Sequence, residues 1–205
     1  MRIGILGGAF NPPHLGHLIC AQEAHRQLGL DVVVLIPVGE APHRTIDQDP
    51  GAEMRFRLCE RAVAGDARLS LSRLEIDRGG RSFTVETLRV LRERAGADER
   101  VLVMGGDQAA TLPEWRDPRA VLELACVAVA DRGDLSRRRV EDAVASVGAD
   151  SKLRFFDMPR IDISSTLVRG RAAAGESIRY LVPDPVADFI AEHDLYKAAA
   201  PVGAE

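Results

Sequence analysis

The chain has 205 residues, a formal net charge of −4 and 46% hydrophobic residues. This length suits one packed domain, so we expect a single domain over residues 1–197 and a frayed tail over residues 198–205. The slightly acidic balance argues against nucleic acid as a partner, and no apolar run is long enough to cross a membrane. Cys20, Cys59 and Cys126 match neither a disulfide framework nor zinc-ligand spacing, which favours a cytoplasmic location.

Apolar segments alternate with helical patterns along the chain. Strands are predicted over Arg2–Leu6, Val32–Pro37, Leu69–Ile76, Val101–Met104, Cys126–Ala130 and Leu153–Phe156. Helices are predicted over His17–Leu28, Ala52–Ala64, Thr84–Ala95, Pro118–Ala125, Arg138–Val147, Ser165–Ala174 and Pro185–His193. Several strand segments are apolar throughout, which is typical of strands buried on both faces. The sequence therefore predicts an α/β fold, a Rossmann-like, open and mainly parallel sheet with helices on both faces and ligands at the carboxyl ends of its strands.

The turn after the first predicted strand carries the strongest functional signal. It reads Gly7-Gly8-Ala9-Phe10-Asn11-Pro12-Pro13-His14-Leu15-Gly16-His17. A strand that turns through glycines into a helix start offers free backbone N–H groups to an anion, and glycine lets a ligand approach the main chain. His14 and His17 share one helix face, and both imidazoles suit phosphate because they can donate hydrogen bonds and can be cationic near neutral pH. A tight turn with incidental histidines is the alternative.

A second signal lies near the end of the chain. It reads Ile163-Ser164-Ser165-Thr166-Leu167-Val168-Arg169. Hydroxyl residues at a helix start can bind phosphate, and Arg169 lies one turn further on, within reach of the same anion. The alternative is an ordinary Ser/Thr cap followed by a surface arginine. Neither G-x-G-x-x-G nor a P-loop is present, which disfavours a dehydrogenase or a P-loop kinase.

Both segments resemble motifs of the nucleotidylyltransferase superfamily, G-G-x-F-x-P-x-H-x-G-H and I-S-S-T-x-x-R. Members transfer a nucleoside monophosphate from ATP or CTP to a phosphate or similar acceptor. The resemblance implies that ATP is bound by Gly7, Gly8, Ala9, Phe10, His14, His17, Ile163, Ser164, Ser165 and Arg169. It also implies catalytic roles for His14, His17 and Arg169. Asn11 stands where many members have Asp, which disfavours a metal-binding role there.

Further segments resemble the nicotinate mononucleotide adenylyltransferases within that superfamily. Pro42-His43-Arg44 resembles P-P-H-K, which implies that Arg44 binds ATP. The remaining segments are similar to S-Y-T-x-x-T-L, G-x-D…W and R-P-G, and they imply mononucleotide binding by Thr84, Gly105, Asp107, Trp115 and Arg132. In this interpretation the start of the helix at Thr84 meets a carboxylate, and Trp115 stacks on a pyridine ring.

Each of these residues also has a structural interpretation. Thr84 and Asp107 suit helix caps, Arg44 suits a solvated loop, and Trp115 suits a half-buried core position. We expect Asp49-Pro50 to cap a helix, the long connection 38–51 to be functional or mobile, and Arg137-Arg138-Arg139 to be a solvated helix face.

The resemblance implies adenylyl transfer from ATP to nicotinate mononucleotide with Mg²⁺ as cofactor, giving deamido-NAD and pyrophosphate. The expected partners are therefore ATP and nicotinate mononucleotide. Nicotinamide mononucleotide or phosphopantetheine as acceptor, and a non-catalytic nucleotide-binding domain, are the alternatives. No residue is assigned as a direct Mg²⁺ ligand, and a homo-oligomer is compatible with the sequence.

Overall fold

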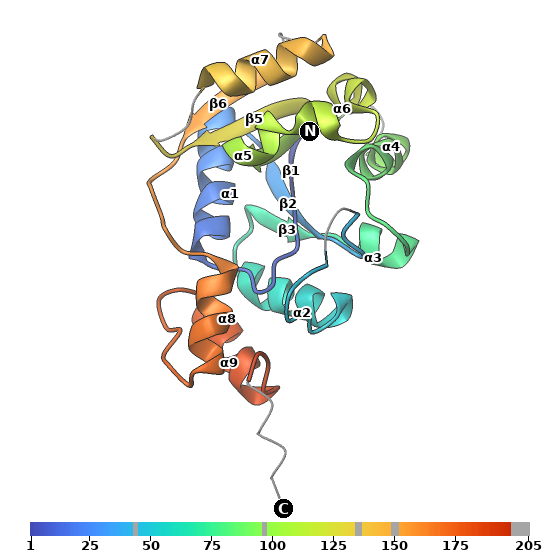
Figure 1. Ribbon diagram of the computed structural model, residues 1–205. Helices are drawn as coiled ribbons and strands as arrows, with labels where there is room; N and C mark the ends of the chain where they lie inside the picture. Colours follow the sequence, from blue (N-terminus) through green and yellow to red (C-terminus); the bar gives the residue numbers. More distant parts are fainter. Residues whose placement is uncertain (43–44, 96–97, 134–136, 149–151, 198–205) are drawn as a thin grey trace, which may run out of the picture.

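The computed structural model describes residues 1–42, 45–95, 98–133, 137–148 and 152–197. Its centre is a six-stranded sheet in the order β3-β2-β1-β4-β5-β6, and each neighbouring pair is parallel (Figure 1). The strands are β1 (Arg2–Gly8), β2 (Val32–Pro37), β3 (Leu69–Leu71), β4 (Glu99–Gly105), β5 (Cys126–Asp131) and β6 (Leu153–Asp157). The prediction of an open parallel sheet is confirmed.

The helices cover both faces of this sheet and extend below it (Figure 1). They are α1 (Leu15–Leu28), α2 (Ala52–Val63), α3 (Leu74–Arg78), α4 (Thr84–Ala95), α5 (Gly106–Ala110), the 3₁₀ helix η1 (Leu112–Glu114), α6 (Pro118–Leu124), α7 (Arg137–Val147), α8 (Ser165–Ala173) and α9 (Asp184–Glu192). The seven predicted helices are confirmed with boundaries within two residues. In the described part of the chain, no helix has the length and apolar character that crossing a membrane requires.

Two local predictions were wrong. The strand predicted over Leu69–Ile76 ends at Leu71, and α3 follows because the Ser72 hydroxyl accepts a hydrogen bond from the Leu74 amide at 3.3 Å and turns the chain. Asp49 does not cap α2, since the N-cap is Gly51 in a positive-φ conformation (95°). The Asp49 carboxylate instead accepts hydrogen bonds from the Gly51 amide and the Arg55 guanidinium, both at 2.9 Å.

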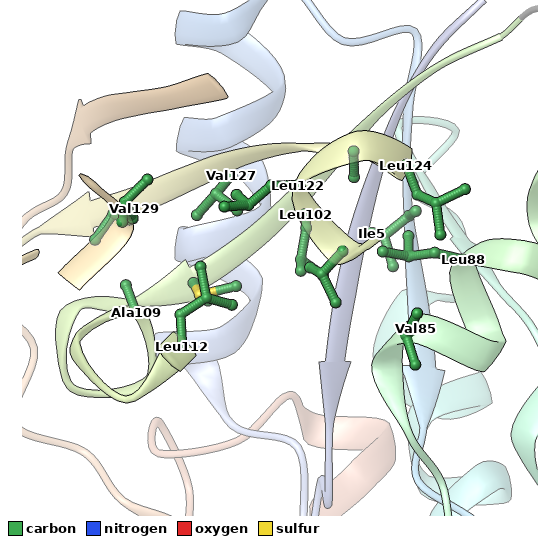
Figure 2. Close-up of a cluster of buried hydrophobic side chains, with 14 of the residues drawn as sticks. Ile5, Val85, Leu88, Leu102, Ala109, Leu112, Leu122, Leu124, Val127 and Val129 are labelled. Atoms are coloured by element: carbon green, nitrogen blue, oxygen red, sulfur yellow. The ribbon is translucent and has the colours of Figure 1, made fainter. Parts of the chain in front are cut away.

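Alternating strand residues supply two cores on opposite faces of the sheet. Ile5 packs with α4, α5 and α6 in the first core, whereas its neighbour Leu6 packs with α1 in the second. Figure 2 shows the first core, where Val85 and Leu88 of α4 face Ile5, and Leu102 and Val127 extend the cluster across β4 and β5. Burial on both faces explains why the strand segments are apolar throughout.

The strand order creates a crevice above β1 and β4. From β1 the chain moves outward through β2 and β3, and it then crosses back to β4 and continues through β5 and β6 on the other side. The connections after β1 and β4 therefore diverge at the carboxyl ends of these strands. Open α/β sheets bind their ligands at such a switch point.

Candidate nucleotide-binding site

A cavity of about 700 Å³ opens at this switch point. Gly7, Gly8, Ala9, Phe10, His14 and His17 line it from the turn after β1 and the start of α1. Ile163, Ser164, Ser165 and Arg169 line it from the start of α8. The two segments singled out in the sequence, about 150 residues apart, thus face one cavity.

Glycines shape the turn after β1 in different ways. A Cβ on Gly7 would meet no atom within 4 Å, so this part of the main chain is open to a ligand. A Cβ on Gly8 would lie 3.2 Å from the Phe10 ring, and one on Gly16 would lie 3.0 Å from the His14 ring. Gly8 and Gly16 therefore make room for neighbouring rings of the protein itself, and the predicted close approach by a ligand is supported at Gly7.

His14 and His17 lie against each other at the start of α1. Their ring centroids are 3.8 Å apart, and the His14 backbone N–H donates to Nδ1 of His17 at 3.2 Å. Nδ1 of His17 is therefore an acceptor, so the neutral ring carries its proton on Nε2. Nδ1 of His14 is buried and has no hydrogen-bond partner among the described residues.

The prediction that both rings can be cationic near neutral pH was wrong. Burial, assisted by the positive charge of Arg132, lowers the pKa of His14 to about 4. Burial, His14 and Arg132 together hold the pKa of His17 well below its usual range. Both imidazoles are therefore neutral at pH 7 and act as hydrogen-bonding groups, so positive charge in the cavity comes from arginines and helix N-termini.

The start of α8 is docked onto the turn after β1. The Ser164 hydroxyl caps the helix by accepting from the Leu167 amide at 3.1 Å, and the Ser165 hydroxyl donates to the Pro12 carbonyl at 2.9 Å. The buried Arg169 donates to the Asn11 carbonyl at 2.9 Å and to the Gln48 side chain at 3.1 Å. Arg169 is thus fixed in orientation at the cavity wall.

Asn11 joins three distant parts of the chain, and it is only 2% exposed. Its side-chain N–H donates to the Asp47 carbonyl at 2.8 Å, and its side-chain oxygen accepts from the Tyr196 hydroxyl at 2.8 Å. Because a carboxylate cannot donate, an amide suits this pair of partners better than Asp would. The connection 38–51, which the sequence marked as functional, contributes Thr45, Ile46 and Asp47 to the cavity lining.

Arg55 supports the site from below and was not expected from the sequence. Its side chain is fully buried in α2. It donates to the carbonyls of Ala9 at 3.1 Å, Val38 at 2.7 Å and Gly39 at 3.1 Å, and it pairs with Asp49 at 2.9 Å. One guanidinium thus holds together the connections that follow β1 and β2. Its position on an amphipathic helix gave no signal, because a helical arginine is usually exposed.

The residues predicted to bind the mononucleotide separate into two groups. Gly105, Asp107 and Arg132 line the cavity together with the predicted ATP-binding residues, whereas Thr84 and Trp115 do not line it. Thr84 begins α4, as predicted, and Trp115 is half-buried against the first core with its indole N–H 3.3 Å from the Thr111 hydroxyl.

Arg116 links these two outlying positions. Its guanidinium forms an ion pair with Glu86 at 2.9 Å and lies 4.5 Å from the centre of the Phe83 ring. The segment that carries Trp115 is therefore fastened to the first turn of α4, where Thr84 lies.

Two other expectations concern basic residues. His43 and Arg44 lie outside the described residues. Arg137, Arg138 and Arg139 are all exposed at the start of α7, as expected for a solvated helix face, and Arg139 also lines the cavity.

The chain belongs to the cytidylyltransferase-like family, a class of nucleotidylyltransferases, because the sequence profile of that family matches residues 5–171. It is 37% identical over 201 residues to a "Probable nicotinate-nucleotide adenylyltransferase" of Rubrobacter xylanophilus, covering 98% of this chain and 94% of that protein. A protein of the same name from Roseiflexus sp. is 38% identical over 195 residues, with 95% and 98% of the two chains covered. Within the class, the chain is therefore a nicotinate-nucleotide adenylyltransferase family member.

Solved structures share the fold. A Plasmodium falciparum nicotinic acid mononucleotide adenylyltransferase complexed with NaAD superposes with a TM-score of 0.78 at 14% identity, covering 95% of this chain and 97% of that chain. At this identity the likeness establishes the architecture alone.

Proposed function

We propose that the chain transfers the adenylyl group of ATP to nicotinate mononucleotide, giving nicotinate adenine dinucleotide and pyrophosphate. The observation that carries this proposal is the meeting of both phosphate-type motifs in one cavity at the switch point of the sheet. The names of relatives at 37–38% identity over nearly the whole chain support nicotinate mononucleotide as the acceptor.

The reaction needs no protein nucleophile. A phosphate oxygen of the mononucleotide forms a bond to the α-phosphorus of ATP, while the bond from that phosphorus to the β-phosphate bridging oxygen breaks and pyrophosphate leaves. Catalysis then depends on holding the two phosphates in line and on stabilising the charge that develops on the α-phosphate and the leaving group.

The proposed roles follow from the arrangement of the cavity. His14 and His17, as neutral rings, would donate hydrogen bonds to phosphate oxygens, and His17 has its proton on the nitrogen that the His14 amide leaves free. The N-terminus of α8 and the fixed guanidinium of Arg169 would hold the triphosphate. Gly7 leaves the main chain open beside them.

The acceptor ring would extend beyond this cavity toward Thr84 and Trp115. The helix start at Thr84 suits the nicotinate carboxylate, and the indole of Trp115 suits stacking on the pyridine ring. The ion pair between Arg116 and Glu86, which fastens these two segments to each other, supports one shared subsite.

Mg²⁺ fits the oxygen donors of the cavity. No cluster of three or more metal-ligating side chains occurs in the described ranges, but Mg²⁺ on a triphosphate keeps several waters and takes only one or two carboxylates. Asp47 and Asp107 line the cavity and are the residues that would hold it. When bound, Mg²⁺ would neutralise phosphate charge. We also propose a cytoplasmic location, which the three free thiols support.

The test is pyrophosphate release with ATP and Mg²⁺, using nicotinate mononucleotide, nicotinamide mononucleotide and phosphopantetheine as separate acceptors. We expect a strong preference for the acid mononucleotide. A preference for the amide would retain the ATP site and overturn the acceptor. Tight ATP binding with no release from any acceptor would instead indicate a non-catalytic nucleotide-binding protein.

A further inference from the structure

Arg169 is a buried cation that the protein surrounds with uncharged acceptors. It is only 8% exposed. Its guanidinium donates to the Asn11 carbonyl at 2.9 Å, to the Gln48 side-chain oxygen at 3.1 Å and to the Thr166 hydroxyl at 3.5 Å. These oxygens belong to a peptide group, a side-chain amide and an alcohol, so none of them carries a negative charge. Hydrogen bonds therefore orient the guanidinium without neutralising it.

The buried Arg55 shows the contrast. Its guanidinium is also held by hydrogen bonds, but one of its partners is the Asp49 carboxylate at 2.9 Å. Arg169 forms no ion pair with any described residue, although Asp47 and Asp49 flank Gln48 in the sequence. Burying a cation without a counter-charge costs free energy. Because Arg169 lines the cavity, an anion bound there would supply the counter-charge.

Gln48 is the side chain that decides whether Arg169 keeps its charge. It lies on the connection between β2 and α2, is exposed, and reaches the Nε of Arg169 without being one of the residues that line the cavity. A glutamate at this position could accept the same hydrogen bond, but it would also pair with the guanidinium. The amide of Gln48 therefore supplies the acceptor without the charge.

We propose that Gln48 is a positioning residue of the anion site. Its neutral amide orients Arg169 and leaves the full charge of the guanidinium for the phosphates of a bound nucleotide. Gln48 acts through Arg169, since it does not itself line the cavity. This inference rests on the proposed function in taking a nucleoside triphosphate as the ligand, whereas the electrostatic argument needs only a polyanion.

The experiment measures the binding of inorganic tripolyphosphate and of ATP by calorimetry, in buffer without Mg²⁺ so that no metal ion masks the charge. Gln48→Glu is compared with the wild type and with Gln22→Glu, the same change of charge at an exposed position of α1 that does not line the cavity. We expect Gln48→Glu to weaken the binding of both anions by about five- to tenfold, because a carboxylate beside the guanidinium offsets its charge. Gln22→Glu should bind both within about twofold of the wild type, because water and salt screen an exposed charge.

Gln48→Met separates the charge from the hydrogen bond. It removes the acceptor and adds no charge, so we expect it to weaken anion binding by about threefold or less. Urea unfolding without ligand should show Gln48→Glu to be at least as stable as the wild type, because it gives Arg169 a counter-charge, and Gln48→Met to be no more stable than the wild type. A merely structural role would not combine retained stability with weakened anion binding.

Equal anion affinity in Gln48→Glu and Gln22→Glu would overturn the inference. Weaker binding in Gln48→Met than in Gln48→Glu would also overturn it, because the hydrogen bond alone would then matter. The same holds if Gln48→Glu loses stability and anion binding together. Failure of the wild type to bind ATP would overturn the proposed function as well, whereas a wild type that binds ATP beside an unaffected Gln48→Glu overturns this inference alone.

Discussion

Arg55 gives the sharpest test of how this site is held together. Arg55→Met keeps most of the apolar stem and removes the guanidinium, which leaves the buried carbonyls of Ala9, Val38 and Gly39 without their donor. Removing one partner of a buried, hydrogen-bonded charge costs about 3–5 kcal/mol. For a chain of this size, each kcal/mol lowers the melting temperature by roughly 2–4 °C, so a decrease of about 6–20 °C is expected.

Arg57→Met is the matched control because it makes the same substitution two residues further along α2. The Arg57 side chain is 53% exposed and lies 3.9 Å from Glu53. An exposed ion pair of this kind contributes about 0.5 kcal/mol or less to the free energy of unfolding. Urea unfolding and thermal scans of both variants measure the difference. If Arg55→Met unfolds within about 1 kcal/mol of Arg57→Met, the hydrogen bonds of Arg55 do not hold the two connections together and the reasoning is refuted.

Four further predictions concern single side chains of the site. His17→Ala should lower kcat by about a hundredfold or more, as loss of one transition-state donor does, whereas the same change at His25, outside the cavity, should leave kcat unchanged. Trp115→Ala should raise the KM for the mononucleotide far more than the KM for ATP, and equal increases would mean that the indole is structural. Because the folded-state pKa of His14 is about 4, below its usual value, folding stability should fall as pH drops below about 6.5; His14 contributes a loss of roughly 2 kcal/mol by pH 5, and His14→Asn should remove that share while keeping the share that comes from the lowered pKa of His17. Tyr196→Phe removes the donor to the Asn11 side chain and should cost about 1–2 kcal/mol in urea unfolding, and an unchanged midpoint would contradict that hydrogen bond.

The architecture could be predicted because strands that are buried on both faces of a sheet consist of apolar residues throughout. Apolar strands such as Cys126–Asp131 are recognisable without any partner, and the helices between them follow the helical period. The segment after β3 was missed because Leu74 and Ile76 continue the apolar pattern of a strand, while the turn depends on one hydrogen bond made by Ser72. Local contacts of this kind override a short periodic pattern.

The segments of the candidate site that carry sequence motifs could be predicted from the sequence. The properties of the site that depend on burial could not. The glycines and histidines after β1 could be recognised in order, and so could the start of α8. The neutral state of the histidines could not, because their pKa values are lowered by surroundings that only the fold creates.

The contact between Asn11 and Tyr196 has a consequence for synthesis of the chain. The turn after β1 is synthesised 185 residues before Tyr196, whose hydroxyl satisfies the buried amide oxygen of Asn11 in that turn. Chains are made at about 5–20 residues per second, so this turn is exposed for at least about ten seconds before its final partner exists. This turn is therefore completed only after Tyr196 has been synthesised, and a ribosome that stalls within α9 leaves a chain whose first motif lacks this closing hydrogen bond.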